Sequence, residues 1–220
     1  MSIHLMNEIN HLIRMLLELC TITEEALRKS IDSFNNLDVQ NSEEIIQHDE
    51  IIDTKEVEVE EECLKLLALH QPVANDLRLI IAVLKINNDL ERIADLAVNI
   101  AKRTKILSNL GRQYRKFDFS LMFNKSLYML KQSIDALIES DKNAAYQISG
   151  MDDDLDRMNK EMIKDIIKEM KSHPEYTEEL LQYFSISKAV ERIGDHAVNI
   201  CDDIIYITEG NIVRHSDNTE

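Results

Sequence analysis

Apolar residues recur along this chain at intervals of three, four and seven, the spacing that places them on one face of an α-helix. Ser42 and the two glutamates after it are typical of a helix N-cap with acid in the first turn, and Pro72 would end the helix that begins there. The pattern predicts a second helix from Ser42 to His70, after a first helix whose apolar stripe consists of Ile3, Met6, Ile13, Leu17, Cys20, Leu27, Ile31 and Phe34.

A third helix is expected to follow Pro72, which suits a first helical turn, and to end by Gly111, which can adopt a left-handed cap. The second half repeats this layout, with helices predicted over residues 118–140, 141–171 and 177–208. The sequence therefore predicts an all-α fold of two tandem three-helix bundles related by an internal repeat. The predicted divisions are residues 1–111, residues 112–210, and a frayed C-terminal tail at 211–220.

Composition supports the helical interpretation. Four glycines and two prolines among 220 residues leave little material for tight turns, which excludes an all-β or collagen-like chain. The longest apolar run, Leu79–Leu84, is far shorter than the roughly 20 residues of a spanning helix, and the N-terminus lacks the apolar region of a signal peptide. The cysteines form no C-x-x-C motif and occupy apolar helix positions, as reduced core thiols do. We therefore expect a cytoplasmic protein without a transmembrane segment.

The chain is strongly acidic. It has 25 Lys and Arg against 41 Asp and Glu, a net charge of −16. A field of this sign repels the phosphate backbone, so nucleic acid is not expected as a partner. It suits hard cations or a basic partner protein, although an excess of acid also serves solubility alone.

The two halves contain the same motif. Residues 91–100, ERIADLAVNI, align with residues 191–200, ERIGDHAVNI, at an offset of 100 with eight identities in ten. Further upstream the offset becomes 103, and the difference of three residues fits a longer loop in the first half. The chain is therefore an internal duplication.

The duplicated segments place an acidic pair, four residues apart and hence on one helix face, on the second and third helix of each half. Two such helices side by side would gather four carboxylates, which require either a cation or full exposure to water. The residues concerned are Asp49, Asp53, Glu91 and Asp95 in the first half and Asp152, Asp156, Glu191 and Asp195 in the second.

Two interpretations of these acids remain open. A chain this rich in acid contains such pairs by chance, so a solvated acidic face is one of them. Recurrence at matching places in both halves, which Glu56 and Glu60 do not share, favours metal binding. Ligands that are all oxygen favour Mg, Ca, Mn or iron over zinc or copper.

The segment HQPVANDLR at residues 70–78, with the segments 90–100 and 190–200, resembles the PhoU family, the accessory regulators of phosphate-specific transport. The similarity covers essentially the whole chain, including the doubled E-x-x-x-D motif. It implies a homodimer that binds multinuclear metal clusters, iron first, with the four acids of each half forming one cluster site. Gly194 in place of Ala94 is a small-for-small departure that should leave the acidic face intact.

The resemblance also implies a function. The protein would be a regulator of phosphate uptake and a negative regulator of the phosphate-starvation response. It would act as a cytoplasmic adaptor between the phosphate ABC transporter, whose ATPase subunit it contacts, and its sensor histidine kinase. We expect no enzyme, since the sequence has no glycine-rich phosphate loop, nucleophile elbow or zincin motif. The alternative is a carboxylate-bridged metal enzyme of ferritin-like type, which needs E-x-x-H on two helices where this chain has one, from Glu8 to His11.

Residues 102–116 contain six basic side chains and no acid. A docking surface for an acidic partner, or peripheral contact with anionic lipid headgroups, is the functional interpretation. A solvated helix end that complements its own dipole is the simpler one, and we favour it. Three histidines beside the motifs, His70, His173 and His196, are expected to be structural.

Overall fold

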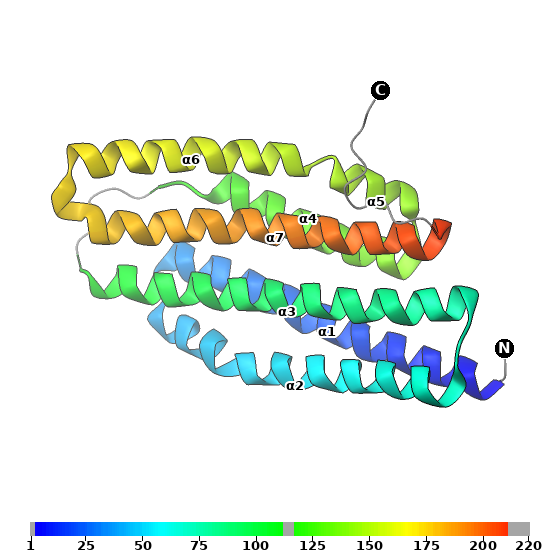
Figure 1. Ribbon diagram of the computed structural model, residues 1–220. Helices are drawn as coiled ribbons and strands as arrows, with labels where there is room; N and C mark the ends of the chain where they lie inside the picture. The colour runs from blue at the N-terminus through cyan, green and yellow to red at the C-terminus, as the bar shows by residue number, and fades with distance from the viewer. Residues whose placement is uncertain (1–2, 112–116, 211–220) are drawn as a thin grey trace, which may run out of the picture.

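The computed structural model describes residues 3–111 and 117–210, and its regular elements there are helices (Figure 1). The first half comprises α1 (Ile3–Asn36), α2 (Val39–His70) and α3 (Ala74–Asn109). The second comprises α4 (Ser120–Glu139), α5 (Lys142–Ser149), α6 (Asp152–Ser172), the 3-10 turn η1 (Pro174–Tyr176) and α7 (Thr177–Glu209). The all-α fold of two tandem helical bundles is confirmed. The boundary at residues 111 and 112 stays a prediction, and the tail at 211–220 lies outside the described residues.

Two long helices, α3 and α7, run antiparallel at the centre of the molecule (Figure 1). α2 packs against α3 and α6 packs against α7, so that the four helices form a row in the order α2, α3, α7, α6. α1 covers α2 and α3, while α4 covers α7. One contiguous apolar core passes through both halves. The acidic segments are therefore positioned on either side of a central helix pair.

An aromatic cluster joins the two halves near the end of α1. The ring of Phe34 packs edge-on against those of Phe119, Phe123 and Tyr183, with centroid distances of 5.5, 5.4 and 6.2 Å. All four side chains are almost fully buried. Because Phe34 belongs to the first half and the other three rings to the second, the halves are expected to unfold together.

Helix α2 begins earlier than predicted. Asp38 is its N-cap, with a side chain that accepts a hydrogen bond from the backbone N–H of Asn41 at 3.0 Å. Ser42 lies inside the helix, buried, and its hydroxyl donates to the carbonyl of Asp38. The prediction of Ser42 as N-cap was wrong because an aspartate four residues earlier already caps the free N–H groups. Pro72 precedes α3 rather than lying in it, and Gly111 takes the expected left-handed φ of 61°.

The helix predicted over residues 141–171 is two helices. α5 ends at Gly150, a residue of low helix propensity, and Asp141 caps its start. α6 then begins with Asp152, Asp153 and Asp154, which are favoured in the first turn of a helix over its interior. Asp152 therefore occupies a helix start, whereas its counterpart Asp49 lies in the middle of α2.

The buried face of α1 differs from the predicted stripe in its first half. Met6 is 45% exposed, and Ile13 and Leu17 are only partly buried. The reason is that α1 packs on α2 and α3 through the apolar positions one residue earlier, which lie about 100° around the helix from the predicted stripe. The residues that enter the core there are Leu5, Ile9, Leu12, Leu16 and Leu19.

The expected positions of the cysteines are confirmed, since Cys20, Cys63 and Cys201 are buried and unpaired. No helix within the described ranges combines the length and apolarity needed to cross a bilayer.

Candidate functional site

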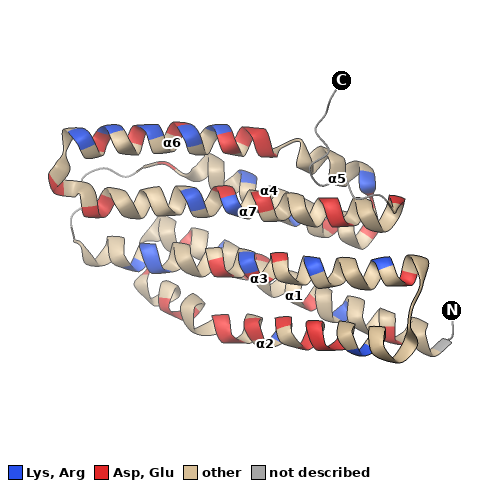
Figure 2. Cartoon of the chain, viewed as in Figure 1, with Lys and Arg blue, Asp and Glu red and all other residues tan. Residues whose placement is uncertain are grey.

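The four acids predicted in the first half lie on neighbouring helices. Asp49 and Asp53 come from α2, Glu91 and Asp95 come from α3, and acidic stretches of these helices face each other in Figure 2. Burial raises the pKa of Asp49, and the charges of Asp53 and Asp95 raise it further. Burial also raises the pKa of Glu91, followed by the charge of Asp95. The structure thus brings these carboxylates into one interacting cluster.

Glu56 of α2 belongs to this cluster, although the search for repeated acids excluded it. Burial raises its pKa, followed by the charges of Glu60 and Asp53, and Glu56 in turn raises the pKa of Glu91. Its Oε1 accepts a hydrogen bond of 3.0 Å from Nδ2 of Asn87 on α3. The first cluster therefore contains more carboxylate than the motif predicts.

The repeat has a polar pair at the place of Glu56 and Asn87 in both halves. At the same offsets, Asn159 takes the place of Glu56 and Ser187 takes the place of Asn87. The hydroxyl of Ser187 donates to Oδ1 of Asn159 at 2.8 Å, and both side chains are buried. A hydrogen bond therefore joins the second and third helix of the repeat in both halves. It joins Asn87 to a carboxylate in the first half and Ser187 to an amide in the second.

The second cluster gathers Asp152 and Asp156 of α6 with Glu191 and Asp195 of α7. Burial raises the pKa of Asp152 to about 6, followed by the charges of Asp195 and Asp156. Burial likewise raises the pKa of Asp195, followed by the charge of Glu191. Four carboxylates thus interact in each half, as the sequence predicts.

Gly194 lets α6 approach α7 closely at this cluster. A Cβ atom on Gly194 would lie 2.5 Å from Cδ2 of the buried Leu155 and 3.5 Å from Oδ1 of Asp152. A separation of 2.5 Å is far inside carbon–carbon contact distance, so a larger residue would force the buried Leu155 side chain to shift. The departure from Ala94 is therefore not neutral for packing between α6 and α7.

Basic neighbours compensate part of the acidic charge. Arg92 Nη1 lies 3.1 Å from Asp95, Lys188 Nζ lies 2.7 Å from Glu191, and Lys160 Nζ lies 3.2 Å from Asp156. All three cations extend over the outside of the clusters and are substantially exposed. Such pairs contribute little each in water, so much of the repulsion inside the clusters remains.

One buried carboxylate oxygen in each cluster accepts no hydrogen bond from the described residues: Glu91 Oε2 and Asp152 Oδ1. Arg92 Nε approaches Glu91 Oε2 to 3.2 Å, but not in hydrogen-bonding geometry. A buried acceptor without a donor is costly, and a hard cation satisfies such an oxygen well. The donor set therefore fits a hard cation in chemical type.

Side-chain placement does not by itself form a metal centre. Within residues 3–111 and 117–210, no three His, Cys, Asp or Glu side chains are arranged so that they could hold a metal ion. Metal binding at the eight predicted acids stays a prediction, which rests on carboxylate clustering and on the two unsatisfied oxygens.

The histidines beside the motifs have other partners. His196 Nδ1 bonds to Oδ1 of Asp89 at 2.8 Å, and His173 lies 3.6 Å from Glu175. His70 bonds to Glu8, the acid of the one E-x-x-H sequence, between α1 and α2. Glu8 is thus paired outside both acidic clusters, which gives no support to the ferritin-like alternative.

The basic stretch 102–116 is partly described. Lys105 forms an ion pair of 2.6 Å with Glu43, and Arg103 donates to Oε1 of Gln182 on α7 at 3.2 Å. Lys102 lies on α3 and contributes to a groove described below. The remaining basic residues, Arg112, Arg115 and Lys116, lie outside the described residues.

Comparison with known proteins identifies relatives over nearly the whole chain. The sequence pattern of the PhoU domain matches twice, at residues 16–104 and 119–204. A phosphate-specific transport system accessory protein PhoU homolog of Clostridium acetobutylicum is 34% identical over 203 residues, covering 92% of this chain and 93% of that protein. The PhoU homolog 1 of Thermotoga maritima is 31% identical over 190 residues, covering 86% and 82%.

Solved structures agree with these sequence relatives. The crystal structure of PhoU from Pseudomonas aeruginosa superposes with a TM-score of 0.90 at 29% identity, over 93% of this chain and 99% of that one. The phosphate transport system regulatory protein PhoU from Streptococcus pneumoniae superposes with a TM-score of 0.86 at 28% identity, over 95% and 99%.

Proposed function

This chain belongs to the PhoU family, and from that premise we propose that it restrains phosphate uptake and represses the phosphate-starvation response when phosphate is plentiful. The observation that carries the proposal is that the PhoU domain matches both halves, so the whole duplicated framework is retained. The relatives are named accessory proteins of the phosphate-specific transport system, and one solved neighbour is named a regulatory protein.

The protein works by contact and performs no chemical step. It acts in the cytoplasm as a homodimer that contacts the ATPase subunit of the phosphate ABC transporter and the sensor histidine kinase. A net charge of −16 favours basic surfaces on these partners and speeds encounter with them.

The acidic clusters bind hard metal cations, iron by family resemblance, with Mg, Mn and Ca as the alternatives. Asp49, Asp53, Glu91 and Asp95 hold one metal cluster, and Asp152, Asp156, Glu191 and Asp195 hold the other. The bound cations supply positive charge that cancels carboxylate repulsion. The protein side chains then hold α2 against α3 and α6 against α7 in a fixed geometry for the partners.

A deletion strain tests the regulatory proposal. In medium with abundant phosphate, deletion should raise both alkaline phosphatase reporter activity and phosphate uptake, and the wild-type gene should restore them. Wild-type reporter and uptake in a deletion strain that lacks any other gene of this family would overturn the proposal.

Metal analysis of the purified protein tests the clusters separately. The double substitution Glu91→Ala with Asp95→Ala should remove the metal of the first cluster. The matched control is Glu161→Ala with Asp165→Ala, an exposed acidic pair of the same spacing on α6, which should retain all metal. Equal metal content in both variants would contradict the site. Loss of metal with intact repression in cells would show that metal and regulation are independent.

A further inference from the structure

The antiparallel contact between α3 and α7 has two ends that the internal repeat makes equivalent but that differ in chemistry. At one end, which we call the closed end, Asp89 is 7% exposed. Its Oδ1 accepts hydrogen bonds from His196 Nδ1 at 2.8 Å and Asn199 Nδ2 at 3.1 Å. Lys85 completes this end with an ion pair of 3.2 Å to Asp203. At the closed end, side chains of the protein itself thus satisfy the carboxylate of Asp89.

At the other end, the open end, the repeat places different residues. Ala189 takes the place of Asp89, Leu96 takes the place of His196, and Asn99 is kept in the place of Asn199. These three residues line a hollow of about 240 Å³. The hollow shares Leu96, Asn99 and Arg192 with a neighbouring groove of about 440 Å³, so the two adjoin. The second copy thus has a hollow where the first copy has the carboxylate of Asp89.

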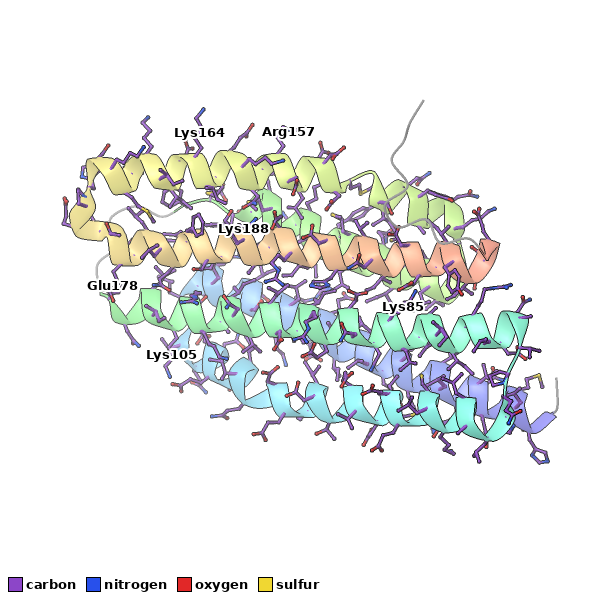
Figure 3. All side chains as sticks on the ribbon, viewed as in Figure 1. Lys85, Lys105, Arg157, Lys164, Glu178 and Lys188 are labelled. Atoms are coloured by element: carbon purple, nitrogen blue, oxygen red, sulfur yellow. The ribbon has the colours of Figure 1, made fainter. Side chains whose placement is uncertain are left out.

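The open end is cationic in a protein of net charge −16. Among the described residues, its walls contain five basic side chains, the ring of His196 and a single acid, Asp95, which is bound to Arg92. The basic side chains are those of Arg92, Lys102, Arg103, Lys188 and Arg192. In Figure 3, Lys188 lies on α7 toward one end of the helix pair and Lys85 toward the other. Positive charge is therefore gathered at the end where the repeat has no counterpart of Asp89.

Two of these cations, Arg192 and Lys102, are exposed to solvent. Neither makes an ion pair or hydrogen bond with another residue in the described part of the chain. Arg103 donates through Nη1 to Gln182, yet its Nε is buried and has no acceptor among the described residues. This N–H is therefore available to an acceptor from outside the chain.

We propose that the open end is a binding site for a small free oxyanion of the phosphate class. Arginine forks recognise phosphate oxygens in paired hydrogen bonds, and a dianion balances more of this charge than a carboxylate would. A hollow of 240 Å³ holds such an anion with part of its hydration shell, since a water molecule takes about 30 Å³. The site stands whether or not the regulatory role proposed above is correct.

Calorimetric titration with inorganic phosphate tests the proposal, with sodium chloride matching ionic strength. The wild-type protein should bind saturably, and Arg192→Ala should weaken binding by about 10- to 100-fold. Arg157→Ala is the matched control, because it removes the same charge from the outer surface of α6, away from the helix pair (Figure 3). Absence of saturable phosphate binding, or equal affinities for the two variants, would overturn the proposal.

A second substitution reconstructs the closed end. Ala189→Asp restores the missing carboxylate beside Asn99 and should abolish phosphate binding, with circular dichroism verifying the fold. Retained phosphate affinity in the folded Ala189→Asp protein would refute the placement of the site. Vesicles containing phosphatidylglycerol distinguish a lipid headgroup from the free ion. Binding of these vesicles without binding of inorganic phosphate would also overturn the proposal.

Discussion

The burial of the Asp152 carboxyl group in the second acidic cluster should affect the free energy of unfolding of the protein. Burial, followed by the charges of Asp195 and Asp156, raises its pKa from 3.8 to about 6. The ionised carboxylate is therefore destabilised in the folded, metal-free protein. We predict that Asp152→Asn, which keeps the shape and removes the charge, increases the free energy of unfolding at pH 7.5.

The magnitude follows from linkage. A rise in the pKa of Asp152 from 3.8 to about 6 corresponds to about 3 kcal/mol of destabilisation of the ionised form. Solvent screening of this partly exposed group reduces the effect to about 1 to 2 kcal/mol. Because the folded pKa lies above the unfolded one, the folded state holds the proton more tightly. The contribution of Asp152 to stability is fully present below about pH 4, is lost as the pH rises through about 6, and stays lost above that value. Asp152→Asn should lack this part of the pH slope, whereas other carboxyls with raised pKa, such as Asp195, keep theirs.

Thermal and urea unfolding, followed by circular dichroism in the presence of EDTA from pH 4 to pH 7.5, measures the effect. At about 2 to 4 °C per kcal/mol for a chain of this size, Tm should rise by roughly 2 to 8 °C at pH 7.5. Asp153→Asn is the control, since it removes a charge from the same first turn. The reasoning is refuted if the two variants are equally stable at pH 7.5, or if the pH slope of Asp152→Asn is as steep as that of the wild-type protein. With saturating metal, the wild-type protein should become more stable than Asp152→Asn.

Three further substitutions or reactions test the packing. Gly194→Ala should lower the free energy of unfolding by about 1 to 2 kcal/mol, because the new Cβ atom would collide with Leu155. Gly150→Ala is the control, since a Cβ atom there would lie 3.5 Å from its nearest neighbour, the carbonyl oxygen of Gln147. Urea titration compares the two variants. Phe34→Ala should cost about 3 to 5 kcal/mol and keep a single unfolding transition, and two separate transitions in calorimetry would contradict a shared core. The three cysteine thiols, whose pKa burial raises to about 12, should resist iodoacetamide at pH 8 until denaturant is added; rapid alkylation of the native protein would disprove their burial.

Local sequence signals predicted most helix ends but not all. Gly111 ends α3 as expected, because a left-handed conformation favours glycine. The break at Gly150 was missed because an apolar pattern continues across it, and one glycine does not by itself end a helix. The start of α2 was misplaced because two capping residues, Asp38 and Ser42, lie within one turn of each other.

The candidate site was predictable where the duplication conserved the residue type. The four acids of each half lie where the repeated motif placed them. Glu56 was missed because its counterpart, Asn159, is not an acid. The role of Gly194 was underestimated, since only the contact between α6 and α7 shows that a Cβ atom would meet Leu155.

The sequence by itself determined the helical fold class, the duplication and the acidic pairs, because helix periodicity and repeated letters are local properties. Only the tertiary structure decided that α3 and α7 run antiparallel against each other, since contact between residues about 100 positions apart follows from packing of the whole core. That packing places Asp89 beside His196 and leaves Ala189 in a hollow lined by Arg103, Lys188 and Arg192. A few substitutions in and near two nearly identical motifs thereby make one end of the α3 and α7 contact closed by hydrogen bonds and the other end an open hollow.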